Sequence, residues 1–124
     1  MTLRDLARFG ELMRGGGSME GRRVMPKSWV DDILANGDAE AWRRGGGTRF
    51  LPKGTYRSQW YVTGNAHGAF CGIGIHGQWI YVDPEAEVVI AKQSSQPSPQ
   101  DEAADNLTLA GFDALARALE GRAI

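Results

Sequence analysis

The stretch that decides the fold runs from residue 68 to residue 85, Gly68-Ala-Phe-Cys-Gly-Ile-Gly-Ile-His-Gly-Gln-Trp-Ile-Tyr-Val-Asp-Pro-Glu85. Two apolar runs, 69–75 and 78–83, flank a bend that contains His76 and Gly77. Short runs of β-branched and aromatic residues on either side of a glycine-containing bend are typical of a β-hairpin. The stretch therefore predicts two antiparallel strands.

The strand pattern continues on both sides of this hairpin. Over 57–63, Trp60 and Val62 alternate with Gln59 and Tyr61, and this period of two predicts a strand. Residues 83–86 contain a proline that suits a tight turn, and the Val- and Ile-rich run 87–94 predicts one more strand after it. Four consecutive strands joined by short turns indicate an antiparallel meander.

Helical patterns lie before and after the meander. Apolar residues recur at helical spacing over 2–14, 26–35 and 101–120, and a short helix is expected over 38–44. Thr2 and Asp5 have the spacing of a capping box. The apolar stripe expected on the last helix consists of Ala104, Thr108, Phe112, Leu115 and Leu119. The chain is therefore expected to be a single α+β domain over 1–124, with a helical segment 1–44, antiparallel strands within 57–94 and a C-terminal helix.

Composition excludes several classes of protein. Net charge is -1, which argues against a nucleic-acid-binding or membrane-surface protein. The single cysteine, Cys71, lies in an apolar run and is expected to be a buried small hydrophobe. No apolar run approaches the length of a membrane span and no signal peptide begins the chain, so the chain as it stands is expected to be soluble and cytoplasmic. The four tryptophans (Trp29, Trp42, Trp60 and Trp79) are expected in the core.

A series of motifs in order resembles one known family. The series comprises the helix 2–10 with the glycines 15–17, the segment Gly21-Arg-Arg-Val-Met-Pro-Lys-Ser-Trp-Val30, the aromatic strand 56–62, and the stretches 74–78 and 79–83. Together they resemble the β-lactamase-like (penicillin-recognising) serine hydrolases, in the branch of 6-aminohexanoate-dimer hydrolases and class C β-lactamase-related esterases. The resemblance implies the C-terminal portion of that fold.

The resemblance also implies which residues face a substrate. Enzymes of this family combine a Ser-x-x-Lys helix start, a tyrosine loop and a third strand whose end carries an oxyanion donor. By position the third strand falls at 72–74, which makes the N–H of Ile75 the implied oxyanion donor and places Gly74 close to substrate. His76 and Gln78 would follow at the edge of the site. For His76, a structural role in a glycine-rich bend is an equal alternative.

The other two elements of such a site are missing from this chain. None of the six serines is followed by lysine three positions later, and none of the three tyrosines is followed by asparagine two positions later. Because nucleophilic catalysis needs a hydroxyl and its base within hydrogen-bond reach, no catalytic residue is expected here. His67 and His76 lie nine residues apart, with Cys71 between them, a spacing unlike that of zinc ligands. No metal or cofactor is expected, and His67 is expected to be exposed in a turn.

Two hypotheses of different kinds follow. The first is a C-terminal fragment of an amide- or ester-hydrolysing enzyme that is inactive alone. In the intact family fold an N-terminal strand pairs with the last strand, so 87–94 would be an open edge carrying Val88, Val89 and Ile90 beside an uncovered helical face. A homodimer or higher oligomer is then expected. The alternative is a stand-alone, non-catalytic interaction or small-ligand-binding domain that keeps the cleft at 74–78. Neither hypothesis includes a nucleic acid or a membrane as partner.

Overall fold

The computed structural model describes residues 1–122 and confirms the α+β architecture. The helices are α1 (Leu3–Arg14), α2 (Lys27–Ala35), α3 (Ala39–Arg44), the 3-10 helix η1 (Gly47–Arg49) and α4 (Glu102–Leu119). The strands are β1 (Ser18–Met19), β2 (Arg22–Arg23), β3 (Thr55–Arg57), β4 (Trp60–Val62), β5 (Phe70–Gly74), β6 (Gln78–Asp83) and β7 (Val88–Lys92). Strands β3 to β7 form one antiparallel sheet in sequence order, and β1 and β2 form a separate small hairpin. None of the helices described within residues 1–122 is long and apolar enough to cross a membrane.

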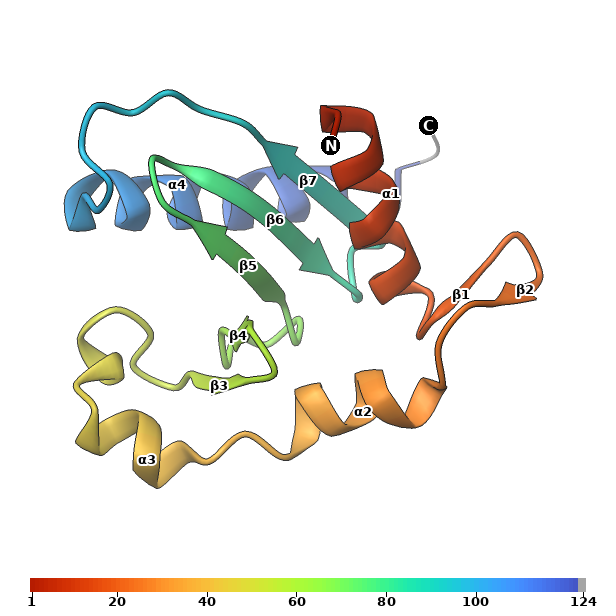
Figure 1. The fold of residues 1–124 in the computed structure, drawn as a ribbon, viewed down its shortest axis with the longest axis horizontal. Coiled ribbons are helices and arrows are strands. Elements are labelled where there is room, and N and C mark those ends of the chain that lie inside the picture. Colours follow the sequence, from red (N-terminus) through yellow and green to blue (C-terminus); the bar gives the residue numbers. More distant parts are fainter. Residues whose placement is uncertain (123–124) are drawn as a thin grey trace.

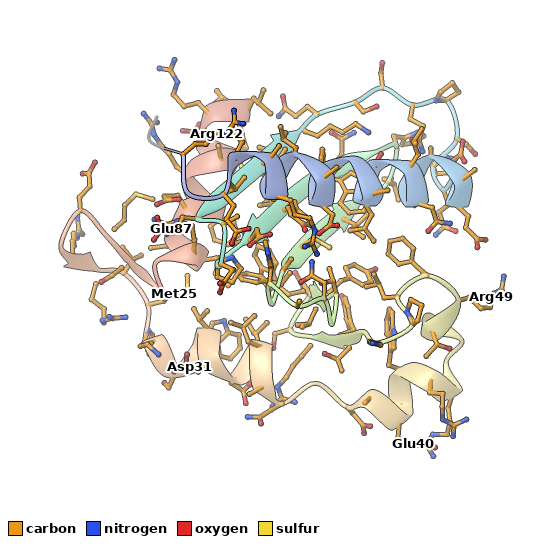
Figure 2. The ribbon with its side chains drawn as sticks, turned by 180° about the vertical axis from the view of Figure 1, so that it is seen from behind. Met25, Asp31, Glu40, Arg49, Glu87 and Arg122 are labelled. Carbon is orange, nitrogen blue, oxygen red and sulfur yellow. The ribbon has the colours of Figure 1, made fainter. Side chains whose placement is uncertain are left out.

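The sheet lies between helices that pack on its two faces. Helix α1 crosses β6 and β7 on one face, and α4 covers the other face, as the front view and the view from behind show (Figures 1 and 2). Because side chains alternate along a strand, the neighbours Phe70 and Cys71 belong to two different cores. The core on the α1 side consists of Met13, Val30, Ile33, Trp60, Phe70, Ile80 and Val82. The core on the α4 side consists of Ala69, Cys71, Trp79, Tyr81, Ala86, Val88 and Ala116.

Helix ends match the capping signals in the sequence. The Thr2 Oγ1 accepts a hydrogen bond from the Asp5 N–H at 3.1 Å, and the Thr2 N–H donates to the Asp5 Oδ2 at 3.4 Å. This reciprocal pair is the predicted capping box. Asp38 and Asp101 cap α3 and α4 by accepting hydrogen bonds from the N–H groups of Ala41 and Ala104. These local contacts fix where three of the helices begin.

One strand prediction is wrong. The expected strand over 57–63 is in fact the hairpin of β3 and β4, with Arg57 directly opposite Trp60. Its two turn residues, Ser58 and Gln59, have φ of 50° and 72°. This left-handed geometry is that of a two-residue hairpin turn, which usually contains Asn-Gly. The Ser-Gln pair lacks that signal, so the alternating pattern continues through the turn. The hairpin of β1 and β2 was not predicted either, because each strand has only two residues.

Two apolar side chains lie outside the core in which they were expected. Trp29 is 51% exposed, because α2 directs Val30 and Ile33 toward the sheet instead. Leu115 is 46% exposed, because α4 packs on the sheet through Ala116 and its neighbours Leu109, Phe112 and Leu119. In each helix one expected core side chain points away, while Val30 and Ile33 of α2 and Phe112 of α4 pack on the sheet. The direction of a helix face depends on its partner, which the sequence alone does not show.

His67 is half-buried, with its side chain enclosed, and is not exposed in a turn as predicted. Its side chain is 9% exposed, and its Nδ1 lies 2.8 Å from the Oδ2 of the fully buried Asp83. The second ring nitrogen, Nε2, lies 3.5 Å from the Oε2 of Glu120 beyond the end of α4. The other oxygen of Asp83 accepts the Ala86 N–H at 2.8 Å. A buried carboxylate needs such partners, so His67 connects three segments that are distant in sequence.

The same substitution in two helices is predicted to have opposite effects. A Cβ at Gly10 of α1 would lie 2.6 Å from Val89 Cγ1 and 2.9 Å from Ile80 Cγ2. A Cβ at Gly111 of α4 would meet no atom within 4 Å. Gly10→Ala should therefore lower the free energy of unfolding by about 1–3 kcal/mol through overpacking. Gly111→Ala should raise it by about 0.5–1 kcal/mol through helix propensity. Urea denaturation measures the free energy of unfolding of both variants. An equal change of this free energy in both would contradict the close contact of α1 with the sheet.

The stability of the fold is predicted to depend on the charge of His67. The hydrogen bond with Asp83, assisted by the charges of Asp83 and Glu120, raises the pKa of His67 against the opposing effects of burial and of Arg117. Protonation therefore favours the folded chain. This contribution is complete below about pH 6.5, the pKa expected in the unfolded chain, and is lost as pH rises through the higher folded pKa. Melting temperatures should fall across that interval.

The variant His67→Gln should lose this fall in melting temperature between pH 6 and pH 9. The matched control is His76→Gln, which changes the other histidine and leaves the pair of His67 and Asp83 intact. If His67→Gln keeps the wild-type pH dependence, another group is responsible for it.

Candidate functional site

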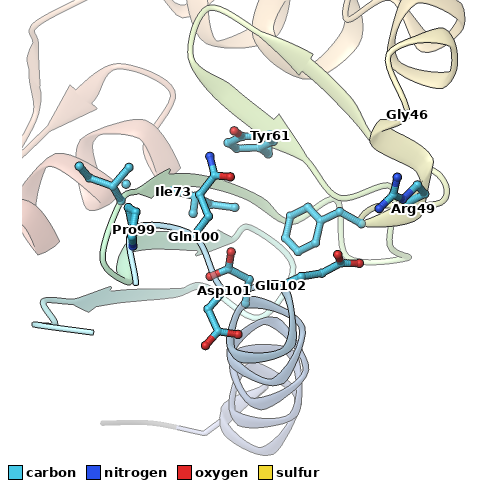
Figure 3. Close-up of a pocket in the computed structure, with 12 residues that line it drawn as sticks. Gly46, Arg49, Tyr61, Ile73, Pro99, Gln100, Asp101 and Glu102 are labelled. Carbon is cyan, nitrogen blue, oxygen red and sulfur yellow. The ribbon is translucent and has the colours of Figure 1, made fainter. Parts of the chain in front are cut away.

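A cavity of about 430 Å³ lies at the end of β5. Three parts of the chain surround it: the loop around η1, the strands β4 and β5 with the turn after them, and the start of α4. Figure 3 shows Arg49 and Tyr61 on the side of η1 and β4, with Asp101 and Glu102 across from them. The residues that line the cavity are Gly46, Arg49, Phe50, Tyr61, Ile73, Gly74, Ile75, Pro99, Gln100, Asp101, Glu102 and Asp105.

Strand β5 is paired on one side only where it reaches the cavity. On one side, all five residues of β5, from Phe70 to Gly74, pair with β6. Strand β4 pairs with Phe70 and Cys71 alone, so no described strand pairs with Ile73 on that side. Because Gly74 also lines the cavity, its backbone can be approached from there. An unpaired strand edge of this kind can accept an extended ligand through main-chain hydrogen bonds.

The turn after β5 presents one backbone donor at the cavity. Ile75 lines the cavity, and among the described residues its N–H donates no hydrogen bond. The next N–H, that of His76, is already used, because it donates to the Pro99 carbonyl at 3.0 Å. His76 and Gly77 have φ of 61° and 84°, and this left-handed geometry forms the tight turn. The Ile75 N–H, which the resemblance implies as an oxyanion donor, thus lies at the cavity without an acceptor among the described residues.

His76 and Gln78 hold the turn from behind and do not line the cavity. The His76 Nδ1 lies 2.8 Å from the Gln96 carbonyl. The Gln78 side-chain amide pairs with the backbone of Ser94: its Oε1 accepts the Ser94 N–H at 3.1 Å and its Nε2 donates to the Ser94 carbonyl at 2.5 Å. The same Nε2 also donates to the His76 carbonyl at 3.1 Å. These contacts fix the segment 94–99 against the turn and so position Ile75.

Charged residues of both signs border the cavity. Arg49 lies on one side, and Asp101, Glu102 and Asp105 lie at the start of α4. Burial raises the pKa of Asp105, as does the charge of Asp101, while Lys92 opposes both effects. The pKa of Tyr61 is raised mainly by burial. This lining has no signal of its own in the sequence, because acidic residues at 101–105 are also what the start of a helix favours. The glycines 45–47 before Arg49 were the one local signal of a loop there.

The described lining contains no serine, cysteine or lysine. Cys71 lies nearby in β5 but is fully buried, and burial raises the pKa of its thiol to about 12. A thiol in that state does not form the thiolate that attacks a substrate. The cavity therefore has a backbone donor, an open strand edge and charged walls, and its described residues supply no nucleophile.

Removal of the Gln78 amide is predicted to loosen the turn. Gln78→Ala leaves the N–H and carbonyl of Ser94 without their side-chain partner, which should lower the free energy of unfolding by about 1–3 kcal/mol. Amide hydrogen exchange over 94–99 should accelerate. The control is Gln100→Ala, which truncates an exposed glutamine of the same loop region. Equal effects of the two substitutions would contradict the role of Gln78.

Comparisons with known proteins show which family the chain resembles. The β-lactamase family matches residues 1–114. A 6-aminohexanoate-dimer hydrolase of Paenarthrobacter ureafaciens is 48% identical over 98 residues, which are 79% of this chain and 25% of that protein. The structure of a putative 6-aminohexanoate-dimer hydrolase from Bacillus anthracis is similar with a TM-score of 0.74 and 33% identity, over 96% of this chain and 29% of that one.

These matches define both the family and the extent of the similarity. The chain spans about a quarter of the length of the curated relative it matches. The similarity to the solved structure covers nearly the whole of this chain. The chain belongs to the β-lactamase family.

Proposed function

We propose that this chain forms the oxyanion-side wall of an amide- or ester-hydrolysing serine enzyme and is inactive alone. The observation that carries the proposal is the free N–H of Ile75 at a cavity beside the unpaired edge of β5. Acyl transfer passes through a tetrahedral intermediate whose oxyanion needs preorganised donors. Ile75 provides one such donor, and the nucleophile's own N–H would provide the second.

The unpaired edge of β5 suits an extended acyl substrate. A substrate that lies along this edge can pair with the backbone of Ile73, because backbone groups alternate along β5 and those of Gly72 and Gly74 point toward β6. Such pairing would direct the substrate carbonyl to the Ile75 N–H. A Cβ at Gly74 would lie 3.1 Å from the Cβ of Gln78, so a larger residue there would crowd the turn. The relatives are named 6-aminohexanoate-dimer hydrolases. A short linear amide is therefore the substrate class we propose for the complete enzyme, with esters and β-lactams as the classes to compare.

Catalysis needs a nucleophile and a base, and none of the motifs in this chain supplies them. In a serine hydrolase, loss of the nucleophile lowers kcat by about 10⁶-fold, while the oxyanion hole and substrate binding retain a small residual rate. The family resemblance implies that a Ser-x-x-Lys segment supplies both groups. Arg49 and Asp105, which line the cavity, would then contact the ends of a bound substrate rather than the reacting bond.

The proposal predicts a strong effect at one backbone atom. The chain alone should not hydrolyse a nitrophenyl ester above the buffer rate. Fusion to the N-terminal portion of a 6-aminohexanoate-dimer hydrolase that carries Ser-x-x-Lys should restore hydrolysis. In the fused enzyme Ile75→Pro, which removes the N–H, should lower kcat by about 10²–10³-fold. Ile75→Ala, which keeps the N–H, is the matched control and should stay within about threefold of the parent.

Two results would contradict the proposal. One is equal activity of the Ile75→Pro and Ile75→Ala fusions with unchanged melting temperatures. The other is ester hydrolysis by the chain alone that survives replacement of all six serines.

A further inference from the structure

The loop that carries Arg49 to the cavity is built around one tryptophan. The Trp42 Nε1 donates to the Leu51 carbonyl at 3.0 Å, so the indole closes the loop between α3 and β3. A Cβ at Gly47 would overlap the Trp42 ring, because the backbone of η1 lies directly against that ring. The N–H groups of Phe50 and Leu51 both donate to the Gly47 carbonyl at 3.0 Å. The backbone on both sides of Arg49 is therefore held in place before any ligand binds.

Arg49 is the one basic residue in the described lining of the cavity, and it differs from its neighbours in having no acidic partner. Arg43 and Arg44 at the end of α3 both lie beside Glu40, and the Arg44 Nε is 4.0 Å from the Glu40 Oε1. Arg49 is exposed and forms no ion pair within residues 1–122, although three carboxylates line the same cavity. A guanidinium in this situation can bind the carboxylate of a ligand through two parallel hydrogen bonds.

The opposite wall of the cavity carries the opposite charge. Asp101 and Glu102 lie across from Arg49 (Figure 3), and Asp105 follows about one turn later on α4. These three carboxylates repel an anionic group, while Arg49 attracts it. A ligand that contains a carboxylate is therefore expected in one orientation, with that group at Arg49 and away from α4.

Arg49 and the Ile75 N–H belong to one cavity. Its volume of about 430 Å³ lies in the range of sites that hold small organic ligands. A linear amide whose carbonyl accepts a hydrogen bond from the Ile75 N–H can thus place one of its ends at Arg49. A contact at the end of a substrate orients the reacting bond without touching it.

We propose that Arg49 binds a carboxylate at one end of the substrate and makes the complete enzyme selective for linear amides that carry one. This inference rests on the proposed function, because it needs the substrate carbonyl at Ile75. Arg49 contacts the end of the substrate and not the reacting bond, so it determines specificity and takes no part in the chemical step. A substrate with an uncharged end gains nothing from Arg49. The selectivity is therefore expected in substrate binding.

Two probes of equal length test this proposal on the full chain by NMR titration. One is the linear dimer of 6-aminohexanoate, and the other is the same dimer with a carboxamide in place of the carboxylate. The Arg49 Nε–H resonance should shift with the carboxylate probe alone, and this probe should bind with a Kd about tenfold lower, as for hydrogen bonds between charged groups. Arg49→Gln should remove the difference in Kd. The matched control, Arg44→Gln, changes an arginine outside the described lining and should keep the difference.

The fused enzyme described above extends the test to catalysis. Arg49→Gln should raise KM for the dimer of 6-aminohexanoate by about tenfold and leave kcat within about threefold, the pattern of a lost binding contact. Hydrolysis of nitrophenyl acetate, which has no carboxylate, should not change. If an acidic side chain of the N-terminal portion pairs with Arg49 instead, the substitution would affect both substrates alike, and this result would overturn the proposal.

The outcomes for Arg49 and for Ile75 are separate. Equal Kd values of the two probes, no shift at Arg49 with either probe, or a difference that survives Arg49→Gln would overturn the role of Arg49. The proposed function would still stand in that case, provided that Ile75→Pro lowers kcat of the fused enzyme. Equal activity of the Ile75→Pro and Ile75→Ala fusions would instead contradict the proposed function itself.

Discussion

The burial of β6 is the constraint on which the rest of the structure depends. Its residues from Trp79 to Asp83 are at most 8% exposed, since β5 and β7 pair with both edges while α1 and α4 cover both faces. A strand enclosed in this way must be almost continuously apolar. The one exception, Asp83, is possible because His67 and the Ala86 N–H satisfy its carboxylate. The turns at both ends of β6 are thereby fixed, and one of them carries the candidate site.

Local signals in the sequence predicted β6 with its neighbour β5 and one of the helix starts. The hairpin at 69–83 was evident from two apolar runs around a bend, and the start of α1 was evident from Thr2 and Asp5. The prediction failed where a residue's environment comes from distant segments. The His67 side chain is enclosed because the end of α4 and the end of β6 lie against it. Trp29 is exposed because Val30 and Ile33 make the contact with the sheet.

The candidate site, too, could be predicted from the sequence only in part. The glycine-rich bend drew attention to Gly74 and Ile75, but only the family resemblance suggested an oxyanion donor. The cavity wall opposite them could not be predicted, because η1 and α4 are brought together by packing on the sheet. The amide pairing of Gln78 with Ser94 was also invisible in the sequence. A glutamine in a bend has no local signature that separates a substrate contact from a contact that supports the turn.

What surrounds the edge of β5, more than its exposure, decides what can bind there. On one side all five residues of β5 pair with β6, while on the other side β4 pairs with Phe70 and Cys71 alone. The short edge left at Ile73 adjoins charged walls and the Ile75 N–H, which has no acceptor among the described residues. Gly74 places no side chain between this backbone and the cavity, so a ligand can approach closely. An unpaired edge this short, beside a backbone donor, therefore suits a small extended ligand better than a further strand.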